Sequence, residues 1–118
     1  MFAPSVGRYG QGMVVEVPLP LVAMPGAADS KALRDCLKTF YAGSAIVAVY
    51  DEAPDEILLR RSMAPSDRLD LRVFGAKDGT QVRLIAVLDN LGKGASGAAV
   101  QNLNLMAGLP ETAGLNLA

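Results

Sequence analysis

Apolar and polar residues follow each other along the chain in patterns that predict four strands and two helices. Residues 13–21 are rich in Val and Leu and predict a strand. Pro18 and Pro20 remove backbone donors, so this strand must end there or lie at a sheet edge. Residues 45–50 form a short apolar run with β-branched members, which is typical of a strand buried on both faces.

The first helix is predicted between residues 29 and 43. Asp29 or Ser30 can cap its start through a side-chain oxygen, and Gly43 suits a left-handed exit. Apolar residues recur at spacings of three and four and share one face, namely Leu33, Cys36, Leu37, Phe40 and Tyr41. Cys36 is therefore expected to be a small buried hydrophobe, with a reactive thiolate as the alternative.

Residues 68–74 and 81–88 predict a β-hairpin. In the first strand Leu69, Leu71 and Val73 point to one face while the charged residues between them point to the other. Asp78 followed by Gly79 is a hairpin turn signal, and the apolar run after it predicts the partner strand. Residues 57–62 show no clear pattern and are predicted to be irregular.

The second helix follows a glycine-rich break after the hairpin. Ser96 can cap this helix, which is expected to reach Gly108, and residues 110–118 are predicted to be a loose tail. The order strand, helix, strand, strand, strand, helix predicts an α+β domain with a mixed, mostly antiparallel sheet and helices on one side. A length of 118 residues fits a single domain.

Composition and charge exclude several classes of function. Lys and Arg number 11 against 12 for Asp and Glu, and the formal charge of −1 argues against binding to nucleic acid or to an anionic membrane surface. The chain has no His and one Cys, so we expect neither a metal site nor an intramolecular disulfide. No apolar run approaches the ~20 residues of a membrane span, and we expect a soluble cytoplasmic protein.

The glycine-rich segment at residues 92–97 is the strongest candidate for a ligand site. Its glycines free backbone amides, the following helix start carries positive partial charge, and Lys93 adds a full charge, which together suit an anion or an amide. The string GKGASG matches Gly-x-Gly-x-x-Gly but lacks the spacing of a P-loop. A purely structural strand-to-helix turn remains the alternative.

The opening segment offers the same two interpretations. Gly7, Gly10 and Gly12 precede the first strand, where backbone can turn sharply or approach a neighbour closely. The segment is either a plain loop or a ligand-facing loop that uses Arg8, Tyr9 and Gln11.

Two long strings resemble a known enzyme family. The string LDNLGKGASGAAVQNLNLMAGL and the opening FAPSVGRYGQGMVVEVPL closely resemble the C-terminal part of N-acetyl-gamma-glutamyl-phosphate reductases of the shorter family type. A looser resemblance runs through LDLRVFG and QVRLIAVLDN. It implies a fold similar to the C-terminal domain of glyceraldehyde-3-phosphate and aspartate-semialdehyde dehydrogenases. Residues 1–118 would then be a single domain, part of the substrate and dimerisation domain.

The resemblance also implies an activity. Members of the family use NADPH to reduce N-acetylglutamyl phosphate to the semialdehyde in arginine biosynthesis, through a cysteine in a Ser-Asn-Pro-Gly-Cys type motif. Nothing like that motif surrounds Cys36. We therefore expect the dinucleotide-binding domain and every catalytic residue to lie outside this chain, and the isolated chain to be inactive. The alternative is a stand-alone, non-catalytic α+β module that binds a ligand or a partner.

Three cofactor-binding residues are carried over from the family. Asn90 matches the asparagine whose side-chain amide faces the nicotinamide carboxamide, and Lys93 and Gly94 match the loop that lines the NADP cleft. A structural role for each remains open. Residues 64–67 depart from the Gly-Thr-Asn or Gly-Ser-Asn of relatives, so no role is transferred to them. The family further implies a homo-oligomer formed through the sheet.

Overall fold

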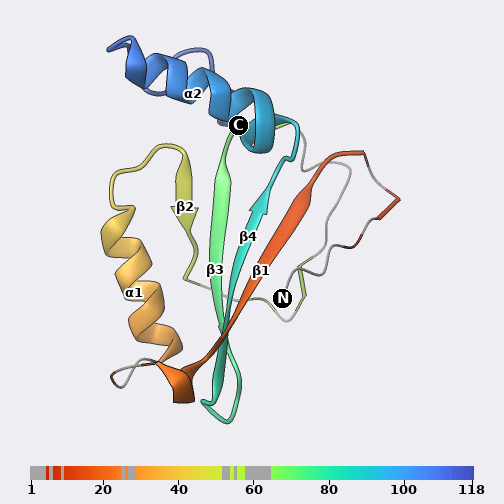
Figure 1. Ribbon diagram of the computed structural model, residues 1–118, viewed down its shortest axis with the longest axis vertical. Coiled ribbons are helices and arrows are strands. Elements are labelled where there is room, and N and C mark those ends of the chain that lie inside the picture. Colours follow the sequence, from red (N-terminus) through yellow and green to blue (C-terminus); the bar gives the residue numbers. More distant parts are fainter. Residues whose placement is uncertain are drawn as a thin grey trace.

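The computed structural model describes residues 5, 7–8, 10–24, 26, 29–51, 54, 56–57 and 65–118. Within these ranges the chain forms four strands and two α-helices in the predicted order (Figure 1). The strands are β1 (Met13–Pro20), β2 (Val47–Val49), β3 (Leu69–Gly75) and β4 (Gln81–Leu88). The helices are α1 (Ser30–Phe40) and α2 (Gly97–Met106), and a π-helical turn, Gly92–Ser96, leads directly into α2.

The strands form one sheet in the order β1-β4-β3-β2. β4 pairs antiparallel with β1 on one side and with β3 on the other, whereas β2 runs parallel to β3. The α+β class with a mixed, mostly antiparallel sheet is therefore confirmed. Pro18 and Pro20 lie on β1, which is an edge strand, so neither ring interrupts a second ladder.

The hairpin between β3 and β4 has the predicted turn. Gly79 has a φ of +70°, a conformation that L side chains rarely adopt. The backbone N–H and the hydroxyl of Thr80 both donate to Asp78 Oδ1, at 3.0 and 2.9 Å. The turn is thus closed by local contacts that the Asp-Gly pair already indicates.

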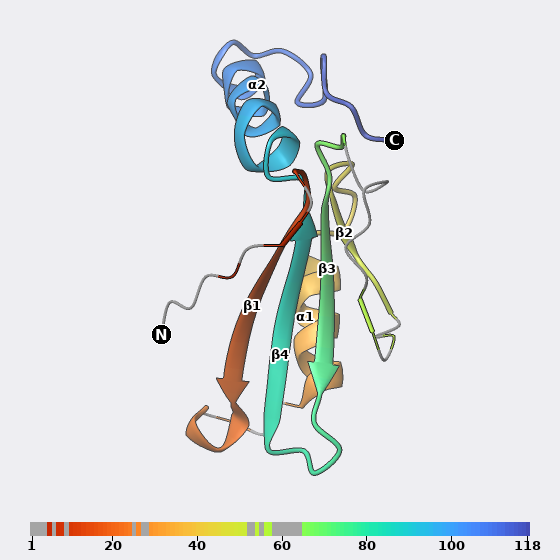
Figure 2. The same ribbon diagram turned by 90° about the vertical axis from the view of Figure 1, so that its right-hand side faces the viewer.

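α1 packs on β3 and β2 and leaves β1 uncovered (Figures 1 and 2). Helix and sheet approach so closely at Gly75 that a Cβ there would lie 2.8 Å from Ser30 Cβ. The buried apolar side chains come mainly from the centre of the sheet and are Ile46, Val73, Val82, Ile85 and Val87.

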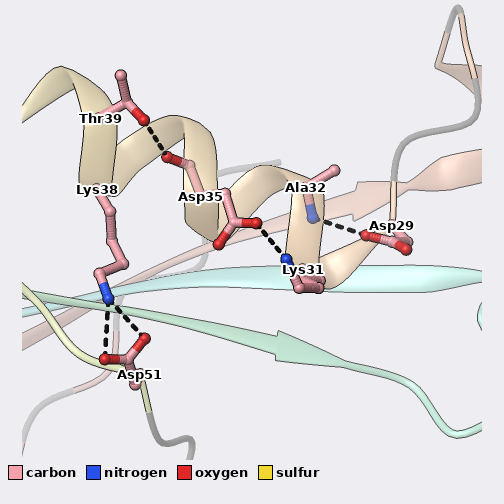
Figure 3. A network of polar contacts seen from close by, with 7 residues as sticks. All are labelled: Asp29, Lys31, Ala32, Asp35, Lys38, Thr39 and Asp51. Carbon is pink, nitrogen blue, oxygen red and sulfur yellow. Dashed lines mark hydrogen bonds and ion pairs between the residues drawn. The ribbon is translucent and has the colours of Figure 1, made fainter.

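Exposed polar contacts fix the ends and the outer face of α1 (Figure 3). Asp29 caps the helix, since its Oδ1 accepts from the backbone N–H of Ala32 at 2.7 Å. Lys31 pairs with Asp35 one turn later at 2.6 Å, and this hydrogen bond lowers the pKa of the Asp35 carboxyl. Lys38 reaches Asp51 just beyond β2 at 2.7 Å. The predicted cap at Asp29 is confirmed, as is the exit at Gly43, whose φ is +83°.

The predicted burial of the apolar face of α1 is wrong for Cys36, which is exposed. Phe40, on the same face, is 78% exposed. The reason lies in the surface beneath the helix: α1 packs mainly on β3 and the three-residue β2, and these contacts leave part of its apolar stripe uncovered.

The strand predicted at residues 45–50 is shorter and less buried than expected. Only Val47–Val49 is β structure, and these three residues are half-buried. Among the described strands β2 pairs with β3 and stands at the edge of the sheet, so it is not covered like a central strand. Ile46, just before it, supplies the buried side chain. The irregular segment predicted at residues 57–62 lies outside the described residues except for Ile57.

α2 lies beyond the end of the sheet, next to the end of β4 (Figures 1 and 2). The prediction that Ser96 caps it is wrong: Ser96 is itself helical, and its hydroxyl donates to the carbonyl oxygen of Leu91 at 2.9 Å. The π-helical turn already occupies the position where a cap would stand. The predicted exit at Gly108 is confirmed by its φ of +67°. None of the helices in the described ranges is long and apolar enough to cross a bilayer.

Candidate functional site

Asn90 lies directly beyond β4 and joins it to the segment before β1. Its Oδ1 accepts from the backbone N–H of Gly12 at 2.8 Å. Because a backbone N–H can only donate, this contact fixes the orientation of the side-chain amide. The Nδ2 group hydrogen-bonds to none of the residues that the structure describes. The half-buried Asn90 thus presents a donor of fixed direction.

Asp89 secures the chain immediately before Asn90. Its side chain is 2% exposed, Oδ1 accepts from the backbone N–H of Leu91 at 2.9 Å, and Oδ2 accepts from that of Ser66 at 3.3 Å. The backbone N–H of Gly94 donates to the Asp89 carbonyl oxygen at 2.8 Å and closes the turn. Sequence reasoning missed this residue, although an Asp at the end of a strand is typical of a turn closed by its own carboxylate.

Close packing explains two of the three glycines of the turn. A Cβ at Gly92 would lie 2.5 Å from the backbone oxygen of Ser66, and a Cβ at Gly97 would overlap the carboxylate of Asp67. Gly94 is less crowded, because a Cβ there would lie 3.3 Å from the Asp89 carbonyl oxygen, and the residue is exposed. The structural alternative therefore holds for Gly92 and Gly97, and Gly94 is the exposed glycine of the turn.

The Lys93 ammonium group is engaged by α2. Its Nζ donates to Gln101 Oε1, and Gln101 Nε2 donates in turn to Glu111 Oε1 at 2.7 Å. The Lys93 backbone N–H donates to the carbonyl oxygen of Ser66 at 3.2 Å. The positive charge predicted for the turn is present, but it is directed along the helix toward the C-terminal segment.

The C-terminal segment is not the loose tail predicted from the sequence. The Asp67 backbone N–H donates to the Asn116 carbonyl oxygen at 2.7 Å, and the Asn116 N–H donates back to Asp67 Oδ2 at 2.8 Å. Asn116 Nδ2 also donates to the carbonyl oxygen of Pro65 at 2.8 Å. Turn chemistry in this segment indicates a loop, but its docking depends on residues about fifty positions away, which no local pattern reveals.

The opening segment reaches the site through its last residues. Gly12, with a φ of +104°, contacts Asn90, and its neighbour Gln11 is half-buried. Arg8 is exposed, and Tyr9 lies outside the described residues. Of the three residues suggested for a ligand-facing loop, Gln11 lies nearest to the site in sequence, because the next residue, Gly12, hydrogen-bonds to Asn90.

Comparisons with known proteins show the family of this chain. A family model described as "Semialdehyde dehydrogenase, dimerisation domain" matches residues 1–90. The N-acetyl-gamma-glutamyl-phosphate reductase of Rhizobium meliloti (strain 1021) is 48% identical over 109 residues, which are 90% of this chain and 35% of that protein. That of Brucella ovis is 49% identical over 111 residues, 92% of this chain and 36% of that protein.

The chain thus spans about a third of the length of the curated relatives that it matches. The resemblance to these reductases, inferred from the DNLGKGASG region and the opening segment, is confirmed. Because the family model covers residues 1–90, well over half of the sequence, this chain belongs to the semialdehyde dehydrogenase dimerisation-domain family.

Proposed function

We propose that this chain is the dimerisation-domain portion of a reductase that converts N-acetylglutamyl phosphate to N-acetylglutamate semialdehyde with NADPH. Support comes from reductases that are about half identical over nine tenths of the chain and about three times as long. In this proposal residues 1–118 form one domain, and the dinucleotide-binding domain and cysteine nucleophile belong to another part of the polypeptide. The 118-residue chain alone is then inactive.

The amide of Asn90 carries the proposed role of this domain at the cofactor. NADPH supplies a hydride when bound, and its nicotinamide carboxamide needs a donor for its oxygen. Asn90 Nδ2 fits that need, because Oδ1 is already held by Gly12 at 2.8 Å. Gly94, which is exposed, would line the cleft beside it, together with the backbone of Lys93.

The test is Asn90→Ala in the full-length polypeptide. If the amide orients the ring, kcat should fall by more than the roughly tenfold loss of affinity expected from one hydrogen bond, because misorientation adds to the lost contact. Asn102→Ala is the matched control, since Asn102 is exposed on α2. An unchanged kcat together with a lowered melting temperature would mean that Asn90 only closes the turn, and would refute the cofactor role.

Inactivity of the isolated chain has its own test. Phosphate-dependent oxidation of the semialdehyde with NADP should show no turnover above a no-protein control. Cys36 is exposed, but LRDCLKT around it has no likeness to the nucleophile motif of the family. Turnover that disappears in Cys36→Ser would overturn this part of the proposal.

We further propose that the domain self-associates through its sheet, as the family description suggests. On β1 the side chains of Met13, Val15 and Val17 are 38%, 42% and 46% exposed and share one face, beyond the reach of α1. Apolar surface of this kind is typical of interfaces. Sedimentation should show a dimer that Val15→Asp weakens and Glu16→Gln, on the opposite face of β1, leaves intact. A clean monomer at micromolar concentration would contradict it.

A further inference from the structure

We propose that the C-terminal segment, residues 109–118, is a positioning element for the candidate turn. It holds residues 65–67 against the backbone of residues 89–97 and so determines where Asn90 and Lys93 lie. The functional consequence rests on the proposed role of the turn at the cofactor. The mechanical coupling itself is a property of this chain and can be tested without any ligand.

The segment is attached to α2 by a buried amide. Asn104 is 5% exposed, and its Nδ2 donates to the carbonyl oxygens of Glu111 at 3.1 Å and Ala113 at 2.8 Å. Both amide hydrogens are therefore used on the same segment. A buried polar group is costly without its partners, so Asn104 and the two carbonyls hold each other in place.

The segment is attached to residues 65–67 by three hydrogen bonds. Two of them join Asp67 and Asn116 in both directions, at 2.7 and 2.8 Å, and the third runs from Asn116 Nδ2 to the Pro65 carbonyl oxygen at 2.8 Å. One of these bonds uses the Asp67 carboxylate, and hydrogen bonds to charged groups are the stronger ones. These three bonds couple the position of residues 65–67 to that of Asn116.

Residues 65–67 in turn interlock with the candidate turn. Ser66 donates its backbone N–H to Asp89 and accepts from that of Lys93, so it is bound to the turn on both sides. The missing Cβ atoms of Gly92 and Gly97 provide the space that Ser66 and Asp67 fill. A displacement of this segment must therefore move the turn or open a gap, and Asn90 is the residue next to Asp89.

A second connection reaches Lys93 directly. The Glu111 carboxylate can only accept, so it takes the Nε2 hydrogen of Gln101 and leaves Oε1 facing the Lys93 ammonium group. If Glu111 is released, the Gln101 side-chain amide can rotate, and its Oε1 is no longer held toward the Lys93 ammonium group. The C-terminal segment consequently acts on the backbone of the turn through Asp67 and on its charge through Gln101.

The experiment measures amide hydrogen exchange and ¹⁵N–¹H NMR shifts on the 118-residue chain. Asn104→Leu removes both donors at similar volume, and Asn102→Leu, at an exposed site of α2, is the matched control. We expect the Gly12 and Lys93 amides to shift and to exchange about two- to tenfold faster in Asn104→Leu, as the loss of one or two hydrogen bonds implies. The amides of Val73 and Val87 in the sheet centre should keep their rates.

A second variant keeps the test decisive if Asn104→Leu fails to fold. Asn116→Ala, at an exposed position, removes the side-chain bonds to the Pro65 carbonyl oxygen and from the Ala118 backbone N–H but keeps both backbone bonds with Asp67. It should move the same two amides in the same direction by a smaller amount. Changes confined to α2 and the C-terminal segment, or an equal rise at Val73 and Val87, would overturn the proposal. Failure of the cofactor role would appear separately, as unchanged kcat for Asn90→Ala in the full-length polypeptide.

Discussion

Gly97→Ala tests the contact between α2 and Asp67 most directly. Gly97 is the first residue of α2 and has helical backbone angles, φ −64° and ψ −40°. Alanine is favoured over glycine by about 0.5–1 kcal/mol in a helix, so the change would stabilise an unobstructed helix. Here the new Cβ would lie 2.5 Å from Asp67 Cγ. Overpacking of this kind typically costs about 1–3 kcal/mol, so we expect a net loss of stability.

The double variant with Asp67→Gly isolates the cause. Without a side chain at position 67 the obstruction disappears, and Gly97→Ala should then stabilise the chain by the helix-propensity term of about 0.5–1 kcal/mol. The change in the free energy of unfolding caused by Gly97→Ala therefore has opposite signs with and without the Asp67 side chain. The coupling energy should equal the overpacking cost of about 1–3 kcal/mol, within the range measured for residues in contact.

Urea unfolding of the four proteins supplies the free energies. For 118 residues at about 2.1 cal/mol/K each, every 1 kcal/mol lost corresponds to a melting temperature lower by about 4 °C. Gly10→Ala is the control, because no heavy atom of the described residues would lie within 4 Å of a Cβ there. If Gly97→Ala is neutral or stabilising with Asp67 present, or if the two changes are additive within about 0.5 kcal/mol, the packing argument is refuted.

Two further predictions concern the hairpin and the exposed thiol. Backbone and hydroxyl hydrogen bonds from Thr80 lower the pKa of Asp78. The stabilising effect of this carboxylate is therefore present above the unfolded pKa of about 3.8 and is lost as pH falls through the lower folded value. Asp78→Ala should lower the melting temperature at neutral pH but not at strongly acidic pH, and an equal loss at both would contradict this assignment. Cys36 should react with a thiol reagent in the native chain at the rate of an exposed thiol. A rate limited by unfolding would show that α1 is covered.

The sequence by itself determined the local elements. Strand 81–88, the hairpin turn at Asp78 and Gly79, and the helix cap at Asp29 all follow from side-chain alternation, backbone freedom and hydrogen bonds within three residues. The prolines limited β1 to two outcomes, an end at these residues or an edge position, and the sheet topology shows the edge. The family resemblance singled out Asn90, and the structure finds its amide bound to Gly12.

Tertiary structure decided what depends on residues far apart in the chain. The apolar stripe of α1 could not show that Cys36 stays exposed, because that depends on which strands the helix packs against. Nor could the C-terminal residues show that they dock, because Asn116 finds its partner Asp67 at a separation of 49 positions. The glycines at 92 and 97 are a further case. Their pattern suggested backbone open to a ligand, whereas Ser66 and Asp67 occupy the space beside them. Local sequence determines backbone conformation, but burial and close packing depend on which segments from distant parts of the sequence pack against a residue.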